Sequence, residues 1–196
     1  MYLRELVIED APLMLAWMHD QGVVGDLRGD FANKTIEDCE SFIETSISES
    51  NIHLAIASDT DEYMGTVSLK NIEDQSAEFA IVVRAEAMKH GYAWFGMEAI
   101  LKKAFDELGL ESVYWCVSRK NVRAVRFYDK HNFNELVDVP KKILQRFAGI
   151  EDLKWYSVLK GDEFDVRDFV AGCKVIHINT IPTVSAGELS FFEATH

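Results

Sequence analysis

The chain has 196 residues, of which 48% are apolar, and a formal net charge of −13 at pH 7. This size and apolar fraction suit one folded domain with an appended segment, and the charge argues against general binding to nucleic acids or anionic membranes. No apolar run is long enough to cross a bilayer, the first five residues lack signal-peptide character, and the three cysteines are far apart, so we expect a cytoplasmic protein with reduced thiols.

The N-terminal part of the chain predicts a strand followed by two helices. Residues 2–8 alternate as a strand does, and Asp10 is a suitable cap for a helix over residues 11–19. We expect the inward side chains of this helix to be Leu13, Ala16 and Trp17. A loop rich in Gly and Asp follows over residues 22–33, and Thr35 opens the second helix with a capping-box pattern.

The remainder of the chain alternates strands with two more helices. Strands are expected at residues 52–57, 63–69, 77–83, 113–117, 133–137 and 153–159. The first two of these flank a polar turn at residues 59–62 and read as an antiparallel hairpin. Apolar spacings of three and four predict a long helix over residues 91–108, and a shorter helix over residues 121–131 ends at Asn132, a suitable left-handed C-cap. This order predicts one layered α/β (α+β) domain built on a mixed sheet.

The composition changes after residue 160. Residues 161–172 are expected to form an acidic linker, and residues 173–196 contain two strand-like runs. Two strands without a sheet are not stable alone. We therefore expect either the start of a second domain that is cut short, or a hairpin that packs on the domain of residues 1–160.

A turn of small residues joins the strand ending at Val83 to the long helix. Its sequence is Lys89-His90-Gly91-Tyr92-Ala93. The free N–H groups at the start of a helix favour a diphosphate, and Gly91 permits close approach of the ligand. Strand–glycine–helix turns are as common in α/β proteins without such a ligand, so both interpretations stay open on this pattern alone.

Three segments carry a more specific pattern: residues 81–83, residues 88–93 and residues 121–133, which read NVRAVRFYDKHNF. Together they resemble the GCN5-related N-acetyltransferase (GNAT) superfamily, and most closely its ribosomal-protein acetyltransferase branch. The resemblance runs from about residue 2 to residue 159. It implies a mixed, mostly antiparallel central sheet with helices on both faces.

The resemblance also implies an N-acetyltransferase that binds acetyl-CoA. The backbone of Ile81 and Val83 would bind the pantetheine amides, and the Asn121 side chain would contact the cofactor arm. Tyr128 would protonate the leaving thiolate, because a phenol and an alkyl thiol have roughly similar pKa values. Glu78 matches a general base in some relatives; the alternative interpretation is a strand-end glutamate in solvent or in an ion pair. The pyrophosphate would bind the turn formed by Met88, Lys89, His90, Gly91, Tyr92 and Ala93.

The sequence departs from the family in this turn. Relatives usually begin it with Gln or Arg and carry a further Gly, where this chain has Met88 and Lys89. We expect Lys89 to be tolerated if its φ is negative, because the donor to phosphate is the backbone N–H. A basic cluster near Asn121 would receive the 3′-phosphate of CoA or form a solvated helix face; it comprises Arg119, Lys120, Arg123, Arg126 and Lys130.

The acceptor is the least determined part of the site. In relatives the acceptor lies at the loop of residues 25–31, where Asp26 and Asp30 could bind an ammonium and Arg28 a phosphate; an ordinary polar loop is the alternative. The run from residue 173 to residue 193 is similar to the opening strands of cupin-fold dTDP-sugar 3,4-ketoisomerases.

This second resemblance implies a covalently linked C-terminal cupin domain in the full-length protein. It also implies acetyl transfer to the amino group of a dTDP-linked 3-amino-3,6-dideoxyhexose. Two alternatives stay open: a ribosomal-type protein Nα-acetyltransferase, and a CoA-binding module without turnover. No metal-ligand pattern is present, and a homo-oligomer is left open.

Overall fold

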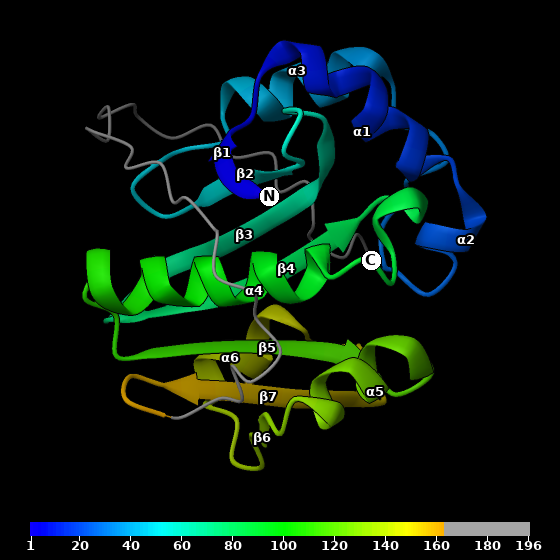
Figure 1. The fold of residues 1–196 in the computed structure, drawn as a ribbon. Coiled ribbons are helices and arrows are strands. Elements are labelled where there is room, and N and C mark those ends of the chain that lie inside the picture. The colour runs from blue at the N-terminus through cyan, green and yellow to red at the C-terminus, as the bar shows by residue number, and fades with distance from the viewer. Residues whose placement is uncertain (163–196) are drawn as a thin grey trace.

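The computed structural model describes residues 1–162, which form a seven-stranded sheet with helices on both faces (Figure 1). The strands are β1 (Tyr2–Glu5), β2 (Ile52–Ala57), β3 (Tyr63–Glu73), β4 (Ser76–Val83), β5 (Ser112–Ser118), β6 (Asn134–Glu135) and β7 (Leu153–Leu159). The helices are α1 (Ala11–Met18), α2 (Gln21–Val24), α3 (Ile36–Glu44), α4 (Tyr92–Lys102), α5 (Val122–Lys130) and α6 (Lys141–Arg146).

The strand order is β1-β2-β3-β4-β5-β7-β6. Every neighbouring pair is antiparallel except β4 and β5, which run parallel. The sheet is therefore mixed and mostly antiparallel, as predicted. In the described part of the chain, no helix has the length and apolar character needed to cross a lipid bilayer.

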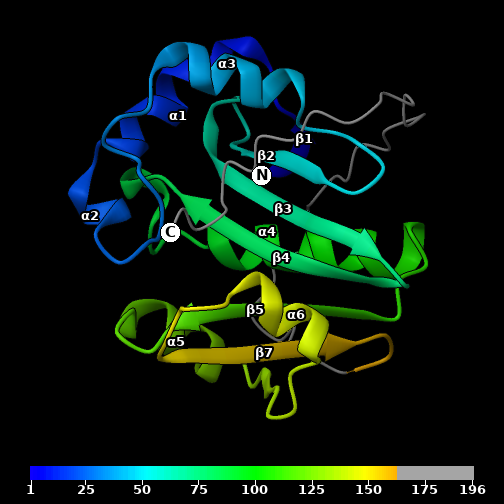
Figure 2. The ribbon, with the colours of Figure 1, turned by 180° about the vertical axis from the view of Figure 1, so that it is seen from behind.

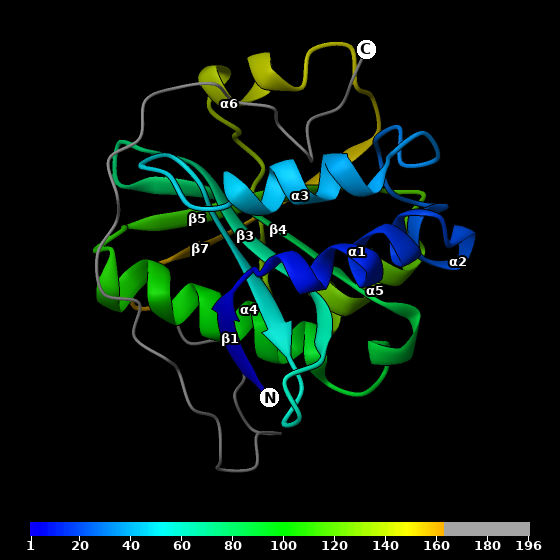
Figure 3. The same cartoon turned by 90° about the horizontal axis from the view of Figure 1, so that it is seen from above.

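Alternation of side chains along the strands builds one core on each face of the sheet. Leu54 and Val67 pack in the core beneath α4, whereas Ala55 and Val82 pack in the core beneath α1 and α3. Figure 3 shows α1 and α3 side by side over the sheet, and Figure 2 shows α6 in front of β5, on the face opposite α4. The polar positions of β3 and β4 therefore lie on the face that α1, α3 and α6 share.

Helix α1 buries a different stripe from the expected one. Trp17 is buried as predicted, but Ala16 is exposed, and Met14 and Met18 are buried in its place. Residues 11, 14 and 18 follow the three- and four-residue spacing of one helical face, on which residue 16 does not lie. The prediction for Ala16 was wrong for that reason.

Several boundaries also differ from the predicted ones. The long helix ends at Lys102 and continues as a π turn over Lys103–Glu107, and β6 has only two residues. Helix α2 overlaps the start of the expected loop, and at its N-terminus the Asp20 carboxylate accepts a hydrogen bond from the Gly22 N–H. Helix α6 was not predicted, because none of its residues is buried and it has no apolar stripe.

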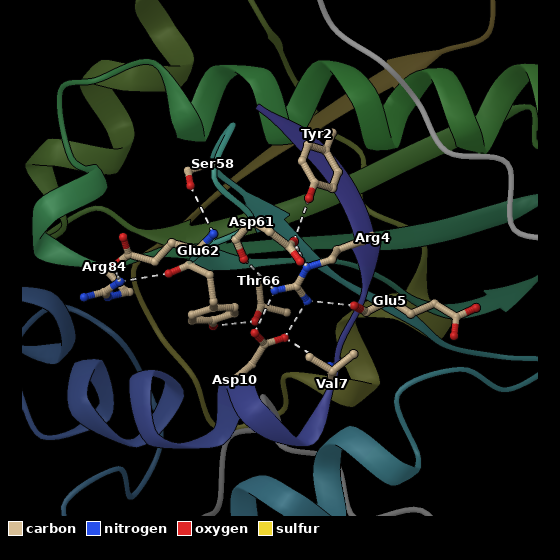
Figure 4. A network of polar contacts seen from close by, with 11 residues as sticks. Tyr2, Arg4, Glu5, Val7, Asp10, Ser58, Asp61, Glu62, Thr66 and Arg84 are labelled. Atoms are coloured by element: carbon tan, nitrogen blue, oxygen red, sulfur yellow. Dashed lines mark hydrogen bonds and ion pairs between the residues drawn. The ribbon is translucent and has the colours of Figure 1, made fainter.

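The two helix signals near the N-terminus have different outcomes. Thr35 and Asp38 form the predicted capping box, with hydrogen bonds of 2.9 and 3.3 Å. Asp10 precedes α1 but makes no cap hydrogen bond to it. Its carboxylate instead accepts two hydrogen bonds from Arg4, at 2.7 and 2.8 Å, and one from the Val7 N–H (Figure 4).

Arg4 also donates to Asp61, so it joins β1 to the start of α1 and to the β2–β3 turn.

The expected segment of residues 173–196, and all but the first two residues of the expected linker, lie outside the described residues.

Candidate active site

The candidate site begins where the two parallel strands part. β4 and β5 are joined by only three residue pairs, the last of which is Glu78 with Tyr114. On its other side β4 stays paired with β3 as far as Val83. From residue 79 onward, β4 therefore presents a free edge toward β5, and Figure 2 shows the two strands diverging there.

The direction of the backbone at this edge follows from one hydrogen bond. The Arg84 N–H donates to the Met64 carbonyl on the β3 side, at 2.9 Å. Peptide groups point alternately to the two sides of an extended strand. The N–H and C=O groups of Ile81 and Val83 thus face the gap, which is the geometry expected for them.

The turn before α4 contains two residues in the left-handed region. Gly91 has φ +86° and Lys89 has φ +66°. The condition under which we expected Lys89 to be tolerated, a negative φ, is therefore not met. A lysine in this conformation costs about 1–2 kcal/mol, and the alternation of left-handed residues is typical of main-chain nests that bind anions.

Not all the N–H groups of this turn are free. The Met88 N–H donates to the Ala85 carbonyl and the His90 N–H to the Ala87 carbonyl, at 3.1 and 3.3 Å. Within residues 1–162, no such backbone partner is found for four other N–H groups of the turn: those of Lys89, Gly91, Tyr92 and Ala93. These four are the groups that a pyrophosphate could use.

A cavity of about 190 Å³ fills the space between the parted strands. Residues 81–82, Asn121 and Tyr128 line it. Asp26, Arg28, Lys70 and Glu78 also line it. Asp30, by contrast, is exposed, bonds to Asn33 and does not line the cavity. The structure thus brings two of the three expected loop residues to the site.

Asn121 is buried at the start of α5, where its side-chain oxygen accepts a hydrogen bond from the Ala124 N–H at 3.0 Å. This cap uses the acceptor of the amide, so its NH₂ group is left for a ligand. The rest of the α5 prediction is also confirmed, since Asn132 has φ +57° beyond the helix end.

Tyr128 lies on α5 with its ring packed against Trp115 and Tyr156, at centroid distances of 5.3 and 5.1 Å. Its hydroxyl makes no hydrogen bond to another described residue, and the side chain lines the cavity. Burial raises the pKa of Tyr128 well above its ordinary value of 10.0. The phenol therefore stays protonated. It is a weaker acid than we expected from the similar pKa values of an ordinary phenol and an alkyl thiol.

Glu78 forms an ion pair with Lys70, Oε1 to Nζ at 2.8 Å, and its other oxygen accepts a hydrogen bond from Asn71 at 3.1 Å. Lys70 and Glu78 are directly opposite in the β3–β4 pairing. Glu78 could accept a proton from a substrate only by exchanging one of these partners. The pairing of Lys70 with Glu78 was not predicted from the sequence. A β3–β4 hairpin turn placed near Asp74 would have set the two residues opposite each other.

Two members of the basic cluster have structural partners. Arg119 pairs with Glu135 at 3.1 Å, and Arg123 donates to the Gly22 carbonyl at 3.1 Å, which joins α5 to α2. Sequence reasoning also missed Phe147, which follows α6 and lines the cavity. Arg146 holds this segment in place through the Tyr114 hydroxyl, at 2.8 Å.

Comparison with known proteins agrees with this arrangement. The spermidine N-acetyltransferase of Vibrio cholerae in complex with CoA and spermine has a TM-score of 0.67 at 21% identity, over 81% of this chain and 94% of that chain. A chimera of the Vibrio cholerae enzyme with hSSAT has a TM-score of 0.66 at 21% identity, with the same coverage of both chains. At this identity, these likenesses support the fold.

No curated protein matches the sequence. The acetyltransferase (GNAT) domain family matches residues 1–134, which is more than half of the chain. The parted strands, the N–H groups before α4 and the family match lead to one conclusion: the chain belongs to the GNAT acetyltransferases and is an N-acetyltransferase that uses acetyl-CoA.

Proposed function

We propose that this protein acetylates the primary amine of a nucleotide-linked amino sugar, with a dTDP-linked 3-amino-3,6-dideoxyhexose as the candidate acceptor. The observation that carries this proposal is the mixed charge of the cavity. Arg28 and Lys70 line it together with Asp26 and Glu78. Such a lining suits an acceptor that has both an amine and a phosphate.

The cofactor end of the site fits acetyl-CoA. The free β4 edge at Ile81 and Val83 can pair with the amides of a pantetheine arm, as an added strand would. The open N–H groups of Lys89, Gly91, Tyr92 and Ala93 can hold a pyrophosphate. The Asn121 NH₂ group can donate to the arm. When bound, acetyl-CoA supplies an activated acetyl group as a thioester.

The acceptor end must receive an amine and remove its charge, because only a neutral amine can attack the acetyl carbon. Asp26 attracts the ammonium, and either Glu78, by exchanging one of its partners, or a water that it orients can accept the proton. Arg28 binds the phosphate. Tyr128 then donates a hydrogen bond, and finally its proton, to the sulfur as the thiolate departs.

A polyamine is the second candidate acceptor. The net charge of −13 attracts polycations in general, and the similar Vibrio cholerae structures are spermidine N-acetyltransferases. A basic peptide N-terminus, as in the ribosomal-type enzymes, is a further acceptor that the same charge would attract.

A thiol-release assay with acetyl-CoA separates these candidates. The acceptors are a dTDP-linked amino sugar, spermidine and a peptide with a basic N-terminus, each compared with a blank without acceptor. We expect the amino sugar to give the highest kcat/KM, by roughly tenfold or more. Higher activity with spermidine or the peptide would overturn the choice of acceptor, and tight CoA binding without thiol release would overturn turnover itself.

A pair of variants in the acceptor loop provides the matched control. Asp26→Asn removes a carboxylate that lines the cavity, whereas Asp30→Asn removes one that does not. We expect the acceptor KM to rise several-fold in the first variant alone. Equal effects of the two variants would remove this loop from acceptor binding.

A further inference from the structure

The Lys70–Glu78 pair is the most buried charged pair of the cavity lining. Only 11% and 10% of the two side chains are exposed, and their charged atoms are 2.8 Å apart. Burying both charges costs several kcal/mol of desolvation, and apolar residues often replace such pairs without loss of stability. Stability alone is therefore a weak reason for this pair to occupy the cavity wall.

Two titratable neighbours of the pair, His53 and Cys116, add no charge next to Lys70. His53 lies on β2 opposite Ser68 of β3, with its Nδ1 atom 2.7 Å from the Ser68 hydroxyl. Burial, and then the charge of Lys70, lower the pKa of His53 to about 3, so the ring is neutral. Burial also raises the pKa of the Cys116 thiol to about 12, and this neighbour in the lining stays neutral as well.

The pair therefore contributes no net charge to the wall of the cavity. Of the remaining charged side chains that line it, Arg28 is positive and Asp26 is negative. An acceptor with several ammonium groups would meet a Glu78 carboxylate that is already neutralised, the single carboxylate of Asp26, and the cation of Arg28. An amine that also carries an anionic group meets a partner for each charge.

We propose that Lys70 determines the class of acceptor by neutralising Glu78, so that the cavity rejects polyamines and admits amines with an anionic group. This inference rests on the proposed function, since it requires that the protein acetylate a small amine. It assigns to Lys70 a role in specificity, with no contact to the reacting atoms.

The test measures the ratio of kcat/KM for spermidine to kcat/KM for the anionic amino sugar. A ratio cancels any effect of a variant that is common to both acceptors, including loss of a general base. Lys70→Met removes the cation that neutralises Glu78, so we expect the ratio to rise roughly tenfold or more. Glu78→Gln removes the carboxylate that neutralises Lys70, so we expect the ratio to fall by a similar factor.

Two further variants serve as controls. Lys103→Met removes a lysine of the same exposure, 11%, whose partner Glu107 is 2.7 Å away and which does not line the cavity; its ratio should equal that of the wild type. The double variant Lys70→Met/Glu78→Gln restores a neutral pair, and its ratio should return to within about threefold of the wild type.

The outcomes separate the two proposals. If the wild type acetylates neither amine, the proposed function fails. If the wild type is active and the ratio stays unchanged in Lys70→Met and in Glu78→Gln, the role of Lys70 is refuted. Should Lys70→Met fail to fold, as judged by CoA binding, the opposite shift in Glu78→Gln still decides the question.

Discussion

Substitution of Tyr128 by Phe tests the catalytic part of the site with little disturbance of the fold. The ring contacts with Trp115 and Tyr156 are kept, and the hydroxyl that is removed has no hydrogen-bond partner among the described residues. We therefore expect the free energy of unfolding to change by less than about 1 kcal/mol. CoA affinity should stay within about twofold, because the phenol acts only when the thiolate forms.

The expected loss of rate follows from the role of the hydroxyl as an acid. General acid catalysis typically contributes 10²- to 10⁴-fold, or about 3–5 kcal/mol of activation free energy. Because burial raises the pKa of Tyr128 and so weakens it as an acid, we expect the lower end, a fall in kcat of about 10²-fold. The raised pKa also predicts that kcat has no falling limb from Tyr128 up to about pH 10.

Thiol release measures kcat, and calorimetry measures CoA affinity and stability. Tyr156→Phe is the matched control: its hydroxyl donates to Asp129 at 2.9 Å and its ring stacks on Trp115, but it does not line the cavity. It should keep its kcat. An unchanged kcat in Tyr128→Phe, or an equal fall in both variants, would refute the assignment of Tyr128 as the acid.

Three further predictions concern the framework of the site. Arg4→Met should lower the free energy of unfolding by about 3 kcal/mol, because the buried Asp10 carboxylate loses its bidentate partner. Denaturant titration measures this loss, and a value below about 1 kcal/mol would contradict the reasoning. Gly65→Ala would place a Cβ atom 2.3 Å from the Val82 carbonyl oxygen, so the β3–β4 pairing must shift, and CoA affinity and melting temperature should both fall. His53 takes up a proton near pH 6.5 when unfolded but only near pH 3 when folded. Its contribution to the free energy of unfolding is therefore complete above pH 6.5 and is lost at lower pH, by about 1.4 kcal/mol per pH unit. His53→Gln should lack this pH dependence, and an equal dependence in the two proteins would show that the ring is not buried in the neutral form.

The strands and the segments expected to bind the cofactor could be located from the sequence because they depend on local patterns. The sequence pattern places β2 and β4 almost at their observed bounds and gives the start of β3, which runs four residues further than predicted. Glycine before an amphipathic run locates the start of α4. Asn121 and Tyr128 keep a fixed spacing on one short helix, so a motif in sequence becomes a motif in space.

The acceptor end was less predictable because it is assembled from distant segments. The pairing of Lys70 with Glu78 depends on the register of a hairpin whose pairing shifts near its turn. Phe147 reaches the cavity from a segment that follows an exposed helix. The positive φ of Lys89 breaks the usual preference of lysine, and no side-chain pattern announces a strained backbone.

The pairing of β4 with β5 over only three residue pairs has a consequence for the resistance of the protein to proteolysis in the cell. Apart from the two residue pairs that join the short edge strand β6 to β7, these three pairs are the narrowest connection between neighbouring strands of the sheet. A cofactor bound along the free edge of β4 would supply the strand that is missing there. A ligand that binds only the folded chain protects it in proportion to the logarithm of its concentration. The supply of acetyl-CoA should thus govern how long the enzyme resists proteolysis, as well as how fast it works.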